Sequence, residues 1–364
     1  MLKQLFITGS LFDKVLKIFL FFSPLIWIGS FQQSGLQMLV FNYGALVLFG
    51  LSISLPEKRE FKNYNLALIL GISILISLIK NPFSLSISFI NIVFGCLLYY
   101  AVIRSTVDVE AITKIFIAVA LLNIYMAITQ ICGLKLLYRE YVICGFMAHK
   151  NHLAMFLALV SPILIRRTWT FIPLIMIMLL YLQCYAALLG FLSVLIVWLY
   201  FKSIKLRYKI FLAGILLLGL ACLAMFVMPA YKTSSRVPVW EVILRESFGN
   251  PFLGHGLDSF KAYSNILTTS MLIVINSYSE YMRAIFEYGI FFTTLIGYFI
   301  FRYFKNIVSF GDRLSQALFA SIISFLIMAG FQDVLHITRL AVPFIVILVL
   351  FEVLCLDKRK EIQC

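Results

Sequence analysis

The sequence predicts an all-α protein, a polytopic integral membrane bundle of about twelve transmembrane helices with one large outward loop. Hydrophobic residues make up 62% of the 364 residues and charged residues only 13%, and the mean hydropathy is +1.01. A soluble chain of this length could not bury so much apolar surface. The apolar segments are also continuous runs of helical span length, whereas a β-barrel would need short alternating segments.

Successive apolar runs near or above the length of a membrane span define the expected helices. They are residues 15–31, 36–54, 65–80, 84–103, 112–133, 152–166, 170–184, 186–201, 209–229, 283–302, 314–332 and 339–356. Only residues 183–185 separate the seventh run from the eighth. The spans are nearly free of charged residues.

The distribution of Lys and Arg predicts the orientation of the bundle. One set of alternating loops, which includes both termini, carries about twice as many Lys and Arg as the other set. The positive-inside rule therefore places both termini in the cytoplasm and residues 230–280 outside. The net charge of +14 reads as a topology signal, and without a basic patch on a soluble face we expect no nucleic-acid partner. We expect residues 1–364 to form one integral membrane domain, with 230–280 as a large outward loop within it.

The large loop has a helical signal of its own. Val239, Val242, Ile243 and Phe248 recur at helical spacing after Pro238, a residue favoured in the first helical turn. Asn250-Pro251 should end this helix, and Gly254 and Gly256 follow. We expect an amphipathic helix on the outer surface.

Polar residues that could carry chemistry gather on the outward side. Outward cations are Arg139, Lys150, Arg236, Arg245, Lys261, Arg283 and Arg339. Arg283 and Arg339 lie at helix mouths, where an ionisable group is costly and often functional, and the planar guanidinium suits phosphate oxygens. Snorkelling, or pairing with nearby carboxylates, is the alternative for each of these cations. Among the carboxylates, Glu280, Glu287 and Asp333 lie at outward helix ends, where a general base would be needed.

All four His residues also lie at outward positions: His149, His152, His255 and His336. His149 and His152 have the i, i+3 spacing of two metal ligands, but no Asp or Glu lies close by in sequence. Simple tolerance of His at an interface is the alternative. We expect neither a metal nor a cofactor.

Three motifs carry a resemblance to a known family. They are SRVPVWEVILRESFGNPFLGHGLDSF at residues 235–260, GFMAHKNHLAMFLAL at 145–159 and GFQDVLHITR at 330–339. In their order and their shared outward side, these segments resemble the motifs of the O-antigen polymerase and O-antigen ligase superfamily. The resemblance covers roughly the second half of the chain, and the first half agrees only in topology.

The resemblance implies a metal-independent glycosyltransferase of the bacterial inner membrane, with its active site on the periplasmic face. Its donor would be a glycan linked to undecaprenyl pyrophosphate, with membrane lipid around it and a chain-length regulator protein as a further candidate partner. Arg236 would correspond to the essential loop arginine that grips the pyrophosphate, and Asp333 and Arg339 to the pair at the late turn. The catalytic candidates are Arg236, Glu280, Asp333 and Tyr278. The candidates for binding pyrophosphate or glycan are Arg236, Arg339, Arg283, Lys150, His149, His255 and Trp240.

One departure from the family pattern separates two activities. In ligases, a catalytic His is followed by Asn, Ser or Gln, then by nine further residues, and then by a Gly. Here Ser279 and Gly289 fit that frame, but Tyr278 stands at the His position. The resemblance therefore favours a polymerase that extends lipid-linked repeat units of O-antigen, capsule or exopolysaccharide. A ligase that transfers the glycan to lipid A core is the alternative. A lipid-linked-sugar flippase is the alternative from another class, and nearly charge-free spans argue against it.

Overall fold

The computed structural model describes residues 9–25, 34–54, 71, 87–105, 107–133, 143–147, 149–201, 214, 236–257, 259–260, 279–308, 312–335 and 337–363. Within these residues the protein is all-α, with twelve helices and no strand. The helices are α2 (Leu11–Phe22), α3 (Ser34–Ile53), α5 (Ile87–Arg104), α6 (Val109–Ile131), α7 (Lys150–Arg167), α8 (Phe171–Leu182), α9 (Tyr185–Phe201), α11 (Arg236–Gly249), α13 (Glu280–Tyr288), α14 (Ile290–Ile307), α15 (Arg313–Ala329) and α16 (Thr338–Gln363). The expected all-α class is confirmed.

Most expected apolar runs in the described part of the chain correspond to helices. The runs at 36–54, 84–103, 112–133, 152–166 and 314–332 match α3, α5, α6, α7 and α15 to within a few residues. The break inside 170–201 is also present, because Gln183 adopts a left-handed conformation (φ 52°) that caps α8 before α9 begins. The runs at 65–80 and 209–229 lie outside the described residues, apart from Gly71 and Gly214.

Two of the described helices are long and apolar enough to cross a membrane. They are α6, over Val109–Ile131, and the Arg339–Lys358 part of α16. Several others are apolar but shorter, among them α8, α9 and α15.

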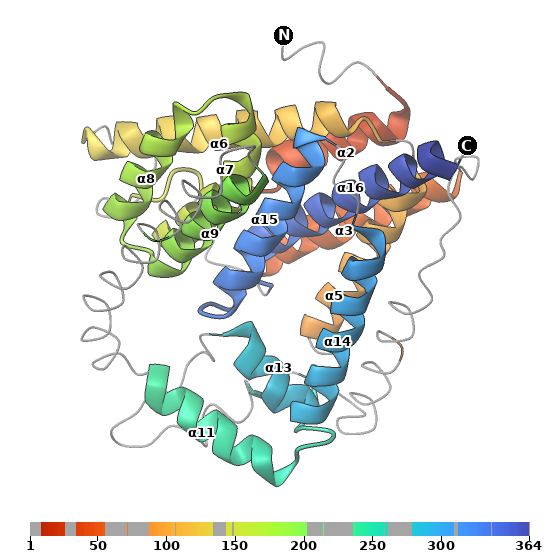
Figure 1. Ribbon diagram of the computed structural model, residues 1–364, viewed down its shortest axis with the longest axis vertical. Coiled ribbons are helices and arrows are strands. Elements are labelled where there is room, and N and C mark those ends of the chain that lie inside the picture. Colours follow the sequence, from red (N-terminus) through yellow and green to blue (C-terminus); the bar gives the residue numbers. More distant parts are fainter. Residues whose placement is uncertain are drawn as a thin grey trace.

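Helix α7 lies at the centre of the bundle, where every residue from Leu153 to Ile165 is buried. It packs against α6, α8, α9, α15 and α16, and Figure 1 shows α15 running alongside it. A helix buried on all sides needs apolar residues all round, as the α7 sequence provides. The main hydrophobic core lies between these helices.

Pro162 interrupts the hydrogen bonding of α7 without leaving its partner unsatisfied. Proline has no N–H, so the carbonyl of Ala158, four residues earlier, loses its helical donor. The Ser161 hydroxyl donates to that carbonyl over 2.8 Å, and the Ser324 hydroxyl from α15 donates to it over 3.3 Å. The two serines therefore replace the missing bond and tie α15 to α7.

Helices α11 and α13 form a second, smaller packing unit, which in Figure 1 lies below the main bundle. Its core contains Val239 and Ile243 from α11, Phe286 from α13, and Phe260. The predicted loop helix is thus confirmed as α11, and Val239 and Ile243 form its buried face with Val242 beside them. Phe248, which was expected to belong to the same apolar pattern, is exposed.

The expected span at 283–302 is wrong as a single helix. The chain forms α13 up to Tyr288 and α14 from Ile290, and Gly289 separates them with φ of 82°. A left-handed φ ends a helix, and glycine adopts it without the cost that a side chain brings.

One buried carboxylate inside the main bundle was not singled out from the sequence. Glu352 of α16 accepts hydrogen bonds from the hydroxyls of Tyr99 on α5 and Tyr303 on α14. Both carboxylate oxygens therefore have a donor, and three helices are joined at one point. This explains how a charged residue is tolerated within an apolar helix.

Candidate functional site

The start of α13 is fixed to the turn between α15 and α16. Glu280 is buried, and its Oε1 accepts the backbone N–H of Leu335 over 2.6 Å. The Tyr281 hydroxyl donates to the carbonyl of Leu326 over 2.6 Å. Burial raises the pKa of the Tyr281 phenol, so this hydroxyl stays protonated. The predicted carboxylate at 280 and the predicted late turn are therefore neighbours in space.

The segment that leads into α7 is shaped by two polar side chains of α6. Gln130 Oε1 accepts the backbone N–H groups of Cys144 and Gly145, over 3.0 and 2.9 Å. Asn123 Oδ1 accepts the N–H of Phe146 over 3.0 Å. Gly145 has φ of 58°, and a Cβ there would lie 2.9 Å from the Asn123 carbonyl oxygen. Asn123 and Gln130 thus position the start of the motif at residues 145–159. Both lie inside an apolar run, so the sequence pattern does not indicate this role.

The first residues of α7 carry two neighbouring His side chains, and one of them, His152, interacts electrostatically with Arg339. His149 caps the helix, with its Nδ1 accepting the N–H of Asn151 over 3.1 Å. Because Nδ1 accepts, the proton of the neutral ring lies on Nε2. The His152 ring lies 5.7 Å from that of His149 and within electrostatic reach of Arg339.

Arg339 is the buried polar residue of this cluster, and the half-buried His152 has one buried ring nitrogen. Arg339, in the first turn of α16, is buried and within electrostatic reach of Cys144. His152 Nδ1 is also buried, and among the described residues it has no hydrogen-bond partner. A buried ring nitrogen without a partner is costly, so it marks a place where a ligand would add a hydrogen bond.

Three helices begin in this region. The contact between Glu280 and Leu335 brings the start of α13 to the turn that precedes α16, and the proximity of His152 to Arg339 brings the start of α7 to the start of α16. The N-terminus of a helix carries unpaired N–H groups and a partial positive charge. With Arg339 and Lys150 added, this end of the molecule is suited to binding an anion. This region is made up of His149, Lys150, His152, Asp333 and Arg339. We call it the N-terminal cluster, after the helix N-termini that it contains and not after the N-terminus of the chain.

The motif NPFLGHG at 250–256 is explained by close backbone packing. Gly256 donates its N–H to the Glu287 carbonyl over 2.9 Å, and Phe291 donates to the Pro251 carbonyl over 3.0 Å. A Cβ at Gly254 would lie 2.5 Å from the Gly289 nitrogen, and both glycines have positive φ. The turn therefore docks onto the junction of α13 and α14 only because both positions are glycine.

Several predicted ligand residues have structural partners in this unit. Arg283 Nε bonds Glu287 Oε1 over 2.9 Å, and the side chains are only 12% and 3% exposed. The His255 ring stacks on Phe286 with centroids 4.4 Å apart, and Trp240 packs against the small core. The structure thus places Arg283, His255 and Trp240 around α13 rather than in the N-terminal cluster.

The remaining predicted residues fall at helix starts or outside the described part of the chain. Lys150 is the first residue of α7, and Asp333 is half-buried in the turn before α16. Arg236 begins α11, but its side chain lies outside the described residues, as does the whole of Tyr278. Among the described residues, no group of three or more His, Cys, Asp or Glu could hold a metal ion.

No protein-family model matches the chain, and no curated protein sequence matches it either. The family resemblance therefore rests on the three motifs themselves.

Proposed function

We propose that this chain is a membrane glycosyltransferase of the O-antigen polymerase and ligase superfamily, acting as a polymerase of lipid-linked repeat units. It spans the bacterial inner membrane about twelve times, with both termini in the cytoplasm and the N-terminal cluster on the periplasmic face. Its substrate is a glycan carried on undecaprenyl pyrophosphate. The observation that carries the proposal is the meeting of three helix N-termini with the buried Arg339, at the end of the molecule where two of the motifs lie.

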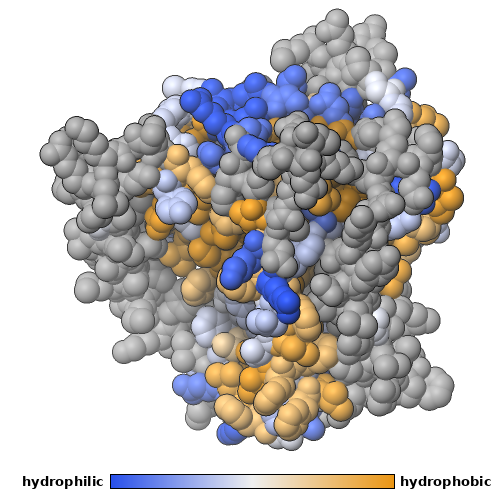
Figure 2. All heavy atoms as spheres, turned by 45° about the vertical axis from the view of Figure 1, so that its right-hand side comes forward, coloured by the Kyte–Doolittle hydropathy of each residue, from blue (hydrophilic) through white to orange (hydrophobic). Residues whose placement is uncertain are grey.

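The membrane placement is supported by apolar side chains on the outside of the bundle. Helix α14 exposes Phe291, Leu295, Tyr298 and Phe301, which recur along one helical face. Helix α6 likewise exposes Leu121, Leu122, Tyr125 and Ile128. On the face drawn in Figure 2, hydrophilic residues gather along the upper edge and hydrophobic residues dominate the lower end, where Figure 1 shows α11, α13 and the start of α14. An amphipathic α11 lying on the outer membrane surface would turn such an end toward the lipid headgroups. Lipid would cover such apolar surfaces at no cost, whereas water would not.

In the proposed reaction, a hydroxyl of the incoming repeat unit attacks the anomeric carbon of the growing chain. A carbon–oxygen bond to the acceptor forms as the carbon–oxygen bond to the pyrophosphate breaks, and undecaprenyl pyrophosphate leaves with the bonding electrons. Negative charge grows on the leaving group, so fixed donors that face it lower the barrier. Arg339, Lys150, the His149 Nε2–H and the helix N-termini supply such donors here, joined by Arg236 from α11.

The acceptor hydroxyl must lose a proton, which a carboxylate can receive. Glu280 already accepts the Leu335 N–H with one oxygen and is buried. This arrangement favours a positioning role for Glu280, in which it holds the turn that carries Asp333. Asp333 is half-buried in that turn and is the better candidate for the base.

Arg236→Ala tests the proposal most simply. In a strain that lacks the gene, the variant should insert normally but yield no polysaccharide ladder on a gel. Arg236→Lys should restore little, because a point charge replaces a two-pronged donor. Arg245→Ala is the matched control, since Arg245 lies on the same helix, is exposed, and pairs only loosely with Glu246 at 3.6 Å. A normal ladder from Arg236→Ala would remove Arg236 from the proposed site.

A further inference from the structure

A cavity of about 390 Å³ lies at the other end of α7, between α7, α9 and α15. Its polar rim includes Arg166, at the end of α7, and Arg313 and Gln316, at the start of α15. From His152 to Arg166, α7 rises about 21 Å at about 1.5 Å per residue. The cavity is therefore separate from the N-terminal cluster. In the proposed topology it opens toward the cytoplasmic side.

The wall of the cavity is apolar and aromatic. Trp169 and Trp198 meet edge to face, with ring centroids 4.1 Å apart. Val194, Ala317 and Ala320 continue the lining toward the middle of the bundle. Trp is enriched where a membrane protein meets the lipid headgroups, because its ring is apolar and its N–H is polar.

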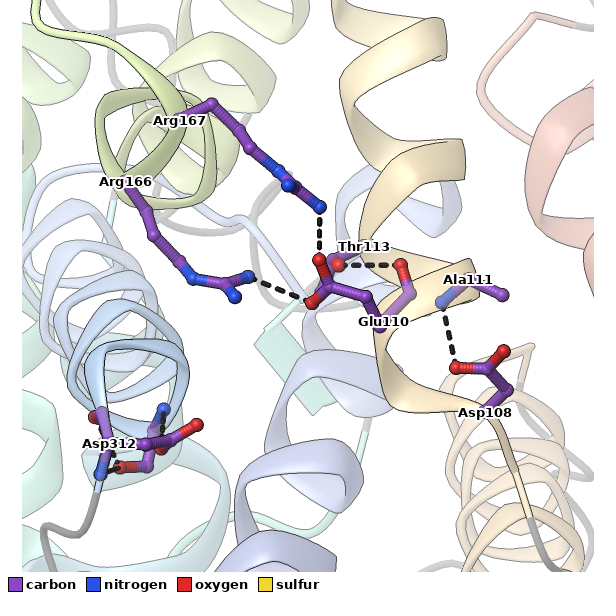
Figure 3. A network of polar contacts seen from close by, with 8 residues as sticks. Asp108, Glu110, Ala111, Thr113, Arg166, Arg167 and Asp312 are labelled. Atoms are coloured by element: carbon purple, nitrogen blue, oxygen red, sulfur yellow. Dashed lines mark hydrogen bonds and ion pairs between the residues drawn. The ribbon is translucent and has the colours of Figure 1, made fainter. Parts of the chain in front are cut away.

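The charge on the rim favours an anion. Figure 3 shows Arg166 and Arg167 pointing from the end of α7 toward Glu110 at the start of α6. Glu110 accepts one Arg166 N–H over 3.0 Å, and a guanidinium has five N–H donors. The nearby carboxylate of Asp312 accepts the backbone N–H of Ser315 over 2.8 Å and caps α15. Arg313 is exposed and lines the cavity, so three guanidinium groups, those of Arg166, Arg167 and Arg313, stand against the two carboxylates of Glu110 and Asp312. These five groups together leave a net positive charge.

We propose that this cavity binds the phosphate headgroup of an anionic membrane lipid. The two guanidinium groups and Gln316 would hold the phosphate oxygens, and the two Trp rings and the small apolar residues would receive the first part of the acyl chains. The inference rests on the membrane placement proposed above but not on the transferase activity. Binding of an anionic lipid at this end would anchor the cytoplasmic ends of α7, α9 and α15 to each other.

Native mass spectrometry of the full chain in detergent tests this, with phosphatidylglycerol and phosphatidylcholine as probes. The wild-type chain should retain one phosphatidylglycerol in preference to phosphatidylcholine. Arg313→Ala should weaken that binding at least about tenfold, because one charge-assisted contact is lost. Arg302→Ala is the matched control, since Arg302 is exposed on α14, is expected on the same side, and does not line the cavity. Equal binding by all three proteins would overturn the proposal.

Two further measurements separate a ligand site from a merely structural one. Glu110→Gln should strengthen phosphatidylglycerol binding, because Arg166 and Arg167 would lose their carboxylate partner. Inorganic phosphate at millimolar concentration should not displace the lipid, because it lacks acyl chains. Displacement by phosphate alone, or weaker lipid binding in a correctly folded Glu110→Gln variant, would contradict the lipid assignment. Neither result bears on the polysaccharide ladder, so the two proposals fail independently.

Discussion

The carboxylate of Glu280 accepts the backbone N–H of Leu335 over 2.6 Å and joins the first turn of α13 to the turn between α15 and α16. The two residues are 55 positions apart. Because the Tyr281 hydroxyl also donates to the Leu326 carbonyl, α13 is fixed at two points, one near the end of α15 and one in the turn that follows. The α11–α13 unit is thereby held next to the residues that begin α16, which include Arg339.

Glu280→Ala should destabilise this junction. It would remove a hydrogen bond to a charged group, which contributes about 1.5–3 kcal/mol. The thermal unfolding midpoint in detergent should fall, and Glu280→Gln, which keeps an acceptor oxygen, should recover part of the loss. Glu241→Ala is the control, because Glu241 is exposed on α11. An unchanged midpoint for Glu280→Ala would mean that the contact does not hold the junction.

Gly254→Ala should disrupt the docking of the NPFLGHG turn. The new Cβ would meet backbone atoms of Glu287 and Gly289 at 2.5–2.6 Å, and φ at this position is 57°. We expect faster proteolysis within residues 236–260 and a strong loss of ladder formation. Gly297→Ala, in α14, is the matched control, because a Cβ there meets nothing within 4 Å. Equal resistance to protease in both variants would contradict the tight backbone approach.

The ion pair of Arg283 and Glu287 provides a test of whether Arg283 binds substrate or supports the fold. Arg283→Ala alone should cost about 3–5 kcal/mol, because it leaves a buried carboxylate without that partner. The double variant Arg283→Met with Glu287→Leu should recover much of the stability. If Arg283 supports only the fold, the ladder should return together with stability in the double variant. A stable double variant without a ladder would instead give Arg283 a direct role at the substrate.

Hydropathy predicted the helices of the main bundle because burial in an apolar environment leaves a continuous apolar run, as in α7 and α15. The break at Gly289 was missed because the span was drawn from residue 283, although Arg283 and Glu287 make the residues before the glycine much less apolar than those after it. The packing of residues 250–256 against Gly289 is a tertiary contact that no local pattern shows. The pairing of Glu352 with Tyr99 and Tyr303 joins positions far apart in sequence, which no local pattern shows.

The candidate site was predicted in part. Glu280, Arg339 and His149 were named because polar residues at the mouths of apolar helices are costly and therefore informative. Their grouping in space depends on tertiary contacts, namely that of Glu280 with Leu335 and that of His152 with Arg339. Asn123 and Gln130, which shape the start of α7, lie within an apolar run and carried no signal of their own. The pairing of Arg283 with Glu287 could have been read from their i, i+4 spacing.

The proposed topology predicts the activity of reporter fusions. Alkaline phosphatase joined after Phe260 should be active, because residues 230–280 are placed in the periplasm. Fusions after Lys205 or Cys364 should be inactive, since those positions belong to the Lys- and Arg-rich set of loops. An active fusion after Cys364 would overturn the even number of spans and, with it, the side assigned to the N-terminal cluster.

Complementation by the unmodified chain tests the central claim most directly. The chain is expressed in two strains of its own serotype, one without its polymerase and one without its ligase, and lipopolysaccharide is resolved on a gel. We predict that a ladder of repeat units returns in the polymerase-deficient strain, whereas the ligase-deficient strain stays uncapped because Tyr278 stands where ligases carry a catalytic His. Restoration of capping in the ligase-deficient strain, or no ladder in the other, would contradict the proposal that this chain is a polymerase.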